Sequence, residues 1–170
     1  MRMLVWRLAL LAVVALFAFA QELPPLKNPA PPPEQPLPFS HRTHVEKGLE
    51  CRQCHPMSDP GDFAEIVGTD VCMTCHIAIK TDSAAIQKLA SFHKNGEEIP
   101  WEPVYRLADY MYFSHAVHTK QVKAQCEACH GPVGERSTLA RERDISMAAC
   151  MDCHRAKNAS IACDYCHETR

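Results

Sequence analysis

The sequence has few of the side chains that usually fill a protein core, and neither sign of charge predominates. Phe, Trp and Tyr make up only 7% of the 170 residues. Lys and Arg number 18 against 20 Asp and Glu, a balance that lacks the basic face of a nucleic-acid-binding protein or a polybasic membrane patch. The longest apolar run, residues 8–20, is shorter than the roughly 20 residues of a membrane-spanning helix. Because large aromatic side chains are few, we expect something other than such side chains to fill the interior.

The N-terminus has the pattern of an export signal. Arg2 and Arg7 precede the apolar run, which ends in Ala18-Phe19-Ala20, the small-residue pattern of a cleavage site. The sequence predicts a signal peptide over residues 1–20 and a periplasmic or otherwise exported protein. The alternative is an uncleaved, short membrane anchor. Residues 21–38 contain eight of the thirteen prolines, so we expect an extended, semi-rigid linker there.

A tandem repeat organises the remaining residues, 39–170, which are predicted to form one domain. The phrase Phe-Ser-His-x-x-His begins at Phe39 and again at Phe113. Each copy is followed by two Cys-x-x-Cys-His motifs, the second of which contains Cys-Met-x-Cys-His. The two modules cover about 39–80 and 113–158, and a final motif occupies residues 163–167.

All ten cysteines belong to the five Cys-x-x-Cys-His motifs. Two thiols one helical turn apart can bond to the vinyl groups of a haem, and the adjacent imidazole then lies over the iron. The motif is typical of c-type haem attachment, so we expect five haem c groups, each with its iron. The predicted attachment cysteines are Cys51, Cys54, Cys72, Cys75, Cys126, Cys129, Cys150, Cys153, Cys163 and Cys166, and the predicted axial histidines are His55, His76, His130, His154 and His167.

Two other uses of these cysteines are less favoured by the pattern. A disulfide framework suits an exported chain with an even cysteine count, but it does not require a histidine after every pair. A zinc site also uses Cys-x-x-Cys, but four such ligands per metal would leave one of the five pairs unmatched.

Five histidines lie outside the motifs, one for the sixth position of each expected iron: His41, His44, His93, His115 and His118. Four of them belong to the duplicated phrase, and His93 lies on the apolar face of a helix predicted over residues 84–93. Methionine is the competing sixth ligand, with Met57, Met73, Met111, Met147 and Met151 as candidates. Met73 and Met151 lie inside attachment motifs and are poorly placed to reach the far face of the haem.

Short helices and little or no β-sheet are expected. Thr69-Asp70 and Asp144 with Ser146 are plausible N-caps of helices that carry the second motif of each module. Asp82 or Ser83 begins the helix over residues 84–93, and Asn95-Gly96 ends it. The fold class is thus mostly irregular with short helices, organised around stacked haems.

The stretches FSHRTHVEKGLECRQCH, CMTCH, GEEIPWEPVYRLADYMYFSHAVH, CEACHG and CMDCHR resemble class III (c3/c7-type) multihaem cytochromes. They are most similar to the pentahaem cytochrome subunit of alternative complex III, a bacterial quinol-oxidising complex. The resemblance implies bis-histidine haems in a wire. By that resemblance, the first histidine of each Phe-Ser-His-x-x-His phrase is an axial ligand of the haem attached directly after it, and the second is a ligand of the following haem. The implied pairs are His41 with His55, His44 with His76, His115 with His130, and His118 with His154. By elimination, His93 is left for the haem of His167.

The function expected from this pattern is electron transfer, with no catalytic residues. Redox proteins are the expected partners, a membrane quinol-oxidising complex among them, and neither nucleic acid nor a small-molecule substrate is expected. The alternatives are a multihaem reductase with one open haem site, or a haem subunit of a membrane complex.

Overall fold

The computed structural model describes residues 22–167. The predicted signal peptide and its cleavage site before Gln21 lie outside the described residues. Within residues 22–167, none of the helices has the length and apolar character needed to cross a membrane.

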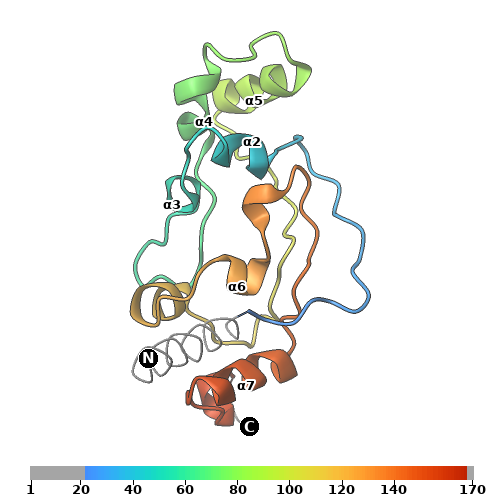
Figure 1. Cartoon of the computed structure of the whole chain (residues 1–170). Coiled ribbons are helices and arrows are strands. Elements are labelled where there is room, and N and C mark those ends of the chain that lie inside the picture. The colour runs from blue at the N-terminus through green and yellow to red at the C-terminus, as the bar shows by residue number, and fades with distance from the viewer. Residues whose placement is uncertain (1–21, 168–170) are drawn as a thin grey trace, which may run out of the picture.

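Short helices joined by long irregular segments make up the described chain (Figure 1). The α-helices are α2 (His41–Val45), α3 (Cys51–Cys54), α4 (Thr69–His76), α5 (Ala84–Asn95), α6 (Glu127–His130) and α7 (Met147–Ala156). Single turns of other helix types are η2 (Val117–Gln121), η3 (Val133–Glu135) and η4 (Cys163–Tyr165). Residues 22–167 contain no strand, and only two isolated bridges, Pro25 with Arg143 and Met111 with His167. The predicted fold class is confirmed.

The helices are spread along one long direction rather than gathered around a centre (Figure 1). Helices α4 and α5 pack together at one end, and α7 with the fifth motif lies at the other. Helices α2, α3 and α6 lie between them. The helices that carry Cys-x-x-Cys-His motifs are therefore distributed over the whole length of the molecule.

The helix signals in the sequence act largely as expected. Helix α5 begins after Ser83 and ends at Gly96, whose φ of 67° is in the left-handed region that glycine adopts without strain. Ser146 caps α7, because its side chain accepts a hydrogen bond from the Ala149 N–H. For α4, however, the N-cap is Gly68, and Thr69 is already the first helical residue.

The proline-rich segment, predicted to be an extended, semi-rigid linker, also contacts the rest of the chain. Its leucines Leu23 and Leu37 are buried. The Leu23 N–H donates to the Ala128 carbonyl at 2.7 Å, and the Asp144 N–H donates to the Pro24 carbonyl at 2.8 Å. The two leucines lie near the two ends of the segment, so both ends pack against the rest of the described chain.

Buried apolar side chains are few. Within residues 22–167 the buried ones are Leu23, Leu37, Leu89, Ala128 and Ala149, each of which keeps 5–7% of its surface exposed. None of them is aromatic, as the low aromatic content predicts. The polypeptide alone therefore lacks a conventional hydrophobic core.

The two modules hold each other by a reciprocal pair of backbone hydrogen bonds. The Ala116 N–H donates to the Gly61 carbonyl at 2.8 Å, and the Arg42 N–H donates to the Arg136 carbonyl at 3.0 Å. Arg42 and Ala116 each follow the first histidine of their module. Gly61 and Arg136 each lie ten positions after the first cysteine of theirs, 61 minus 51 and 136 minus 126. The same donor position in each module thus bonds to the same acceptor position in the other.

Replacement of Gly61 should loosen this contact. A Cβ at Gly61 would lie 2.5 Å from the Ala116 Cβ, so Gly61→Ala forces the modules apart. Gly48→Ala is the matched control, because Gly48 has a φ of 85° against 86° at Gly61 but no heavy atom within 4 Å of a Cβ. We expect Gly61→Ala to lower the free energy of unfolding of the haem-loaded protein by about 1–3 kcal/mol more than Gly48→Ala does. Equal losses in guanidinium unfolding would contradict this contact.

Candidate haem-binding site

Eight histidines form four pairs in the structure. The ring centroids are 6.2 Å apart for His41 and His55, 6.2 Å for His44 and His76, 6.4 Å for His115 and His130, and 6.1 Å for His118 and His154. In each pair one histidine belongs to a Cys-x-x-Cys-His motif and the other to the duplicated phrase. These are the four pairs that the cytochrome resemblance implies.

The separations suit an iron between two imidazoles. A metal–nitrogen bond of about 2 Å on each side, with the ring radius at each end, places the two centroids about 6 Å apart. Direct ring contact would bring them closer, as it does for Phe39 and His44 at 4.3 Å. Among residues 22–167, no three His, Cys, Asp or Glu side chains converge on a common point. The histidines therefore fit a haem, whose porphyrin supplies the other iron ligands.

Backbone carbonyls fix the orientation of six of these imidazoles. The Nδ1 atoms lie at hydrogen-bond distance from carbonyl oxygens: His44 from Ser40, His55 from Glu65, His76 from Ile79, His115 from Asp62, His118 from Ser114 and His154 from Ser160, at 2.6–3.2 Å. An imidazole that donates from Nδ1 keeps its Nε2 lone pair for a metal. These imidazoles thus fit axial ligation in two respects: the separation of the paired rings, and the tautomer that leaves Nε2 unprotonated.

His41 differs from its counterpart in the second module. Its Nδ1 is buried without a hydrogen-bond partner, whereas the His115 Nδ1 bonds to the Asp62 carbonyl at 2.8 Å. Burial, with the neighbouring His55 and His44, lowers the pKa of His41 to about 4. Burial and His115 also lower the pKa of His130. Both shifts keep these imidazoles neutral, the form that binds a metal.

The other residues of the phrase Phe-Ser-His-x-x-His support the two histidines. Phe39 stacks on His44 with planes 14° apart, and Phe113 stacks on His118 with planes 22° apart. The Ser40 side chain caps α2 by accepting from the Thr43 N–H. The repetition of the phrase is visible in the sequence. The stacking of its phenylalanine on its second histidine was not predicted.

The cysteines of neighbouring motifs lie close together. All ten cysteines are free of disulfide bonds. Burial raises the pKa of the Cys126 thiol, and Cys51 of the other module raises it further. In the same way burial, then Cys54, raises the pKa of Cys72, and burial, then Cys166, raises that of Cys150.

The structure does not bring His93 to the fifth motif, where elimination had assigned it. Its ring is exposed, and its Nδ1 hydrogen-bonds the Thr69 hydroxyl at 3.2 Å, which places it over the start of α4. The fifth motif lies at the far end of the molecule from α4 and α5 (Figure 1). Elimination failed here because the partner was chosen by counting histidines, without any restraint on distance in space. The apolar helix face on which we expected His93 instead buries Leu89.

Met111 is also poorly placed as the sixth ligand of the fifth iron. It forms an isolated antiparallel bridge with His167, and residues directly opposite in such a bridge direct their side chains to the same face. The bridge therefore directs the Met111 side chain and the His167 imidazole to the same face of the backbone, and not to opposite sides of one iron. A sixth ligand would have to approach the iron from the opposite side.

We expect His93→Ala to leave the bis-histidine haems unchanged. His93 is a member of none of the four histidine pairs, so its removal takes no ligand from them. Electron paramagnetic resonance of the oxidised protein should show the same low-spin signals as the parent. His115→Ala is the control, because it removes one member of a pair and should convert one signal to high spin. A high-spin signal in His93→Ala would restore His93 as a ligand.

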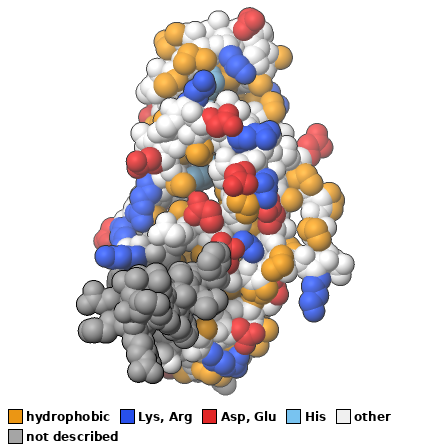
Figure 2. Space-filling model, in the orientation of Figure 1, with side chains coloured by type: hydrophobic (Ala, Val, Ile, Leu, Met, Phe, Trp, Pro, Cys, Tyr) orange, Lys and Arg blue, Asp and Glu red, His pale blue; other side chains and the backbone are white. Residues whose placement is uncertain are grey.

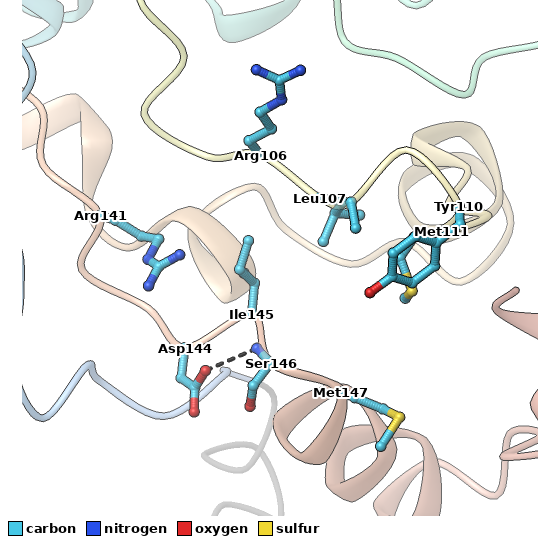
Figure 3. A pocket seen from close by; sticks show the side chains of 10 residues that line it. Arg106, Leu107, Tyr110, Met111, Arg141, Asp144, Ile145, Ser146 and Met147 are labelled. Carbon is cyan, nitrogen blue, oxygen red and sulfur yellow. Dashed lines mark hydrogen bonds between the residues drawn. The ribbon is translucent and has the colours of Figure 1, made fainter.

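A pocket of about 280 Å³ lies between the connector before the second module and the start of α7 (Figure 3). Its lining combines Leu107, Met111 and Met147 with two cations, Arg106 and Arg141. The Asp144 carboxylate accepts from the Ser146 N–H at 2.8 Å at its edge. Through Met111 the pocket adjoins the fifth motif. Its apolar walls and arginines suit a flat apolar ring that carries carboxylates.

Acidic and basic side chains are interspersed over the molecular face in Figure 2. Neither sign forms a continuous patch there. The distribution on this face matches the near balance of charge in the sequence.

The short helices and the paired histidines define a multihaem c-type cytochrome. Residues 111–168 match the family described as cytochrome c7 and related cytochrome c. The chain is also 30% identical over 162 residues to the multihaem cytochrome c subunit of a menaquinone reductase from Nitratidesulfovibrio vulgaris strain Hildenborough, covering 79% of this chain and 77% of that protein. The chain belongs to this family of multihaem cytochromes c, which carry haem c with iron and transfer electrons.

Proposed function

We propose that this chain is a periplasmic electron-transfer protein with five haem c groups, one at each Cys-x-x-Cys-His motif. The observation that carries the proposal is the set of four histidine pairs with centroids 6.1–6.4 Å apart. The fifth motif has the same residue pattern as the other four. The apolar run that ends in Ala18-Phe19-Ala20 supports export.

Each proposed ligand has a defined part. The ten cysteines attach the haems, and the histidines of the motifs hold one side of each iron. His41, His44, His115 and His118 hold the other side at the first, second, third and fourth motifs. His93 is not included, because it lies over α4 and away from the fifth motif.

Each bound haem supplies a one-electron ferric/ferrous couple. The chain sets the properties of that couple through its ligands. Paired imidazoles would give the iron the same two protein ligands in both oxidation states, and in cytochromes c a methionine ligand would raise the potential. Hydrogen bonds from Nδ1 to carbonyls increase the donor strength of the imidazoles. We therefore expect low potentials at the four paired sites.

The pocket beside Met111 is where we propose that the fifth haem packs. Leu107, Met111 and Met147 would contact the ring, and Arg106 and Arg141 would face its propionates. The bridge between Met111 and His167 places the fifth motif next to this pocket.

The partner that we propose is a membrane complex that exchanges electrons with quinone. The relative from Nitratidesulfovibrio vulgaris is named as a subunit of a menaquinone reductase. The stretches that resemble the pentahaem subunit of alternative complex III support the same class of partner. In such an assembly the chain would carry electrons between the complex and another redox protein.

An anaerobic redox titration of the purified holoprotein tests this function. We expect each chain to take up five electrons reversibly, with the haem spectrum returning on reoxidation. The rival hypothesis, a multihaem reductase, requires an iron that binds and converts substrate. We therefore expect the reduced protein not to turn over nitrite or hydroxylamine. Uptake of fewer than five electrons, or sustained consumption of either compound, would contradict the proposal.

A further inference from the structure

The order of the motifs in space differs from their order in the sequence. The reciprocal bonds Ala116 N–H to Gly61 carbonyl and Arg42 N–H to Arg136 carbonyl relate the modules as a self-complementary contact relates two copies of a protein. In such a contact equivalent parts face each other. The segment just after the first motif of one module therefore touches the start of the other module, and the reverse also holds.

Side chains around the first motifs bridge the modules in the same place. The Arg52 guanidinium of the first motif donates to the Thr119 hydroxyl at 3.1 Å. The same hydroxyl lies 3.5 Å from the Met57 sulfur. The His115 N–H and Nδ1 both reach the Asp62 carbonyl, at 3.4 and 2.8 Å. The histidine proposed to serve the third motif is thus held by the segment that follows the first.

The second motif of each module lies on the outer side. His44 pairs with His76 on α4, and α4 packs against α5 at one end of the molecule (Figure 1). His118 pairs with His154 on α7, toward the other end. The two histidines of each Phe-Ser-His-x-x-His phrase lie within one turn of the chain, and they pair with the histidines of the two motifs in the same module. The phrase therefore lies between these two motifs.

The fifth motif continues from the fourth. It follows α7 directly in the sequence, and the Tyr112 N–H donates to the Cys166 carbonyl at 2.7 Å. The thiols of Cys150 and Cys166 are neighbours, as are those of Cys51 and Cys126 and those of Cys54 and Cys72. Cys129 likewise lies near Cys153 and Cys150. These neighbours link the motifs into a single row.

We infer that the five haem sites form one row in the order 72–76, 51–55, 126–130, 150–154 and 163–167, with the first motifs of the two modules back to back. The inference rests on the proposed function, because it takes haem to be bound at every motif. The sites at 72–76 and 163–167 are then the two ends of the row. Electrons that cross the whole protein pass between the sites at 51–55 and 126–130, and the two redox partners meet the protein at opposite ends.

Through-space nuclear magnetic resonance contacts between haem methyl groups test this order in the fully reduced, diamagnetic holoprotein. Two matched variants assign the spectrum. His44→Ala should remove from the diamagnetic region the signals of the site at 72–76, and His118→Ala those of the site at 150–154. In the parent protein we expect methyl contacts between the sites at 51–55 and 126–130, and between 51–55 and 72–76.

Methyl contacts between the sites at 72–76 and 126–130, with none between 51–55 and 126–130, would overturn the order and restore the sequence order. Such a result in a protein that still takes up five electrons would leave the proposed function intact. Failure of the proposed function would show itself separately, as a smaller number of haems or of electrons taken up.

Discussion

Produced without haem attachment, this chain should fail to fold. Within residues 22–167 the buried apolar side chains are three leucines and two alanines, and none of the five is completely buried. Ordering the backbone costs roughly 1–2 kcal/mol per residue at 25 °C, and a core of that size cannot offset it over such a length. Four pairs of imidazoles lie with their centroids 6.1–6.4 Å apart, a separation that fits an iron between the two rings. Haem therefore takes the place of the missing core.

The measurement compares two forms of residues 21–170, the mature sequence that the predicted cleavage would leave. One is made in the cytoplasm without the c-type maturation machinery, and the other is exported and matured. We expect the haem-free form to show a largely disordered far-ultraviolet circular dichroism spectrum and no cooperative unfolding. The matured form, the control, should show helix and a cooperative transition. Cooperative unfolding of the haem-free chain would mean that the polypeptide has a core of its own.

One haem should differ sharply from its neighbours in electron paramagnetic resonance. The imidazole planes are 7° apart for His41 and His55, 6° for His115 and His130 and 27° for His118 and His154, but 62° for His44 and His76. Parallel imidazoles donate into the same iron d orbital and separate it in energy from its partner. Crossed imidazoles donate into both and leave them nearly equal. The site on α4 should therefore give a highly anisotropic low-spin signal, and the other three should give rhombic ones.

His44→Ala tests the assignment of that signal. Removal of this ligand should abolish the highly anisotropic signal and produce one high-spin haem in its place. His118→Ala is the matched control, since it removes the equivalent histidine of the second module, and it should abolish a rhombic signal instead. Loss of a rhombic signal in His44→Ala would contradict the crossed geometry at α4.

The residues of the candidate site could be proposed from the sequence, because the chemistry that they suggest is local. A Cys-x-x-Cys-His motif places two thiols and an imidazole within one helical turn, whatever the rest of the fold does. The same holds for the two histidines on α2, where Ser40 caps the helix. Helix α5 was predicted to within two residues, since Gly96 provides a clear end signal. The proposed ligand roles themselves remain predictions.

What could not be predicted depends on contacts between distant segments. Residues 21–38 were predicted from their prolines to be a linker, but Leu37, near the end of this segment, is buried. His93 was assigned by elimination, and only the packing of α5 on α4 shows that it faces Thr69. The back-to-back arrangement depends on one close approach between Gly61 and Ala116, for which a single sequence carries no signal.

Intact mass spectrometry of the exported protein, with alkylation of the denatured holoprotein, is the most direct test of the central claim that haems bound at all five motifs form the interior. We expect the mass of residues 21–170 plus five haems, and no cysteine that reacts with the alkylating reagent. A mass with four haems or fewer, or alkylation of any of the ten cysteines, would contradict the claim.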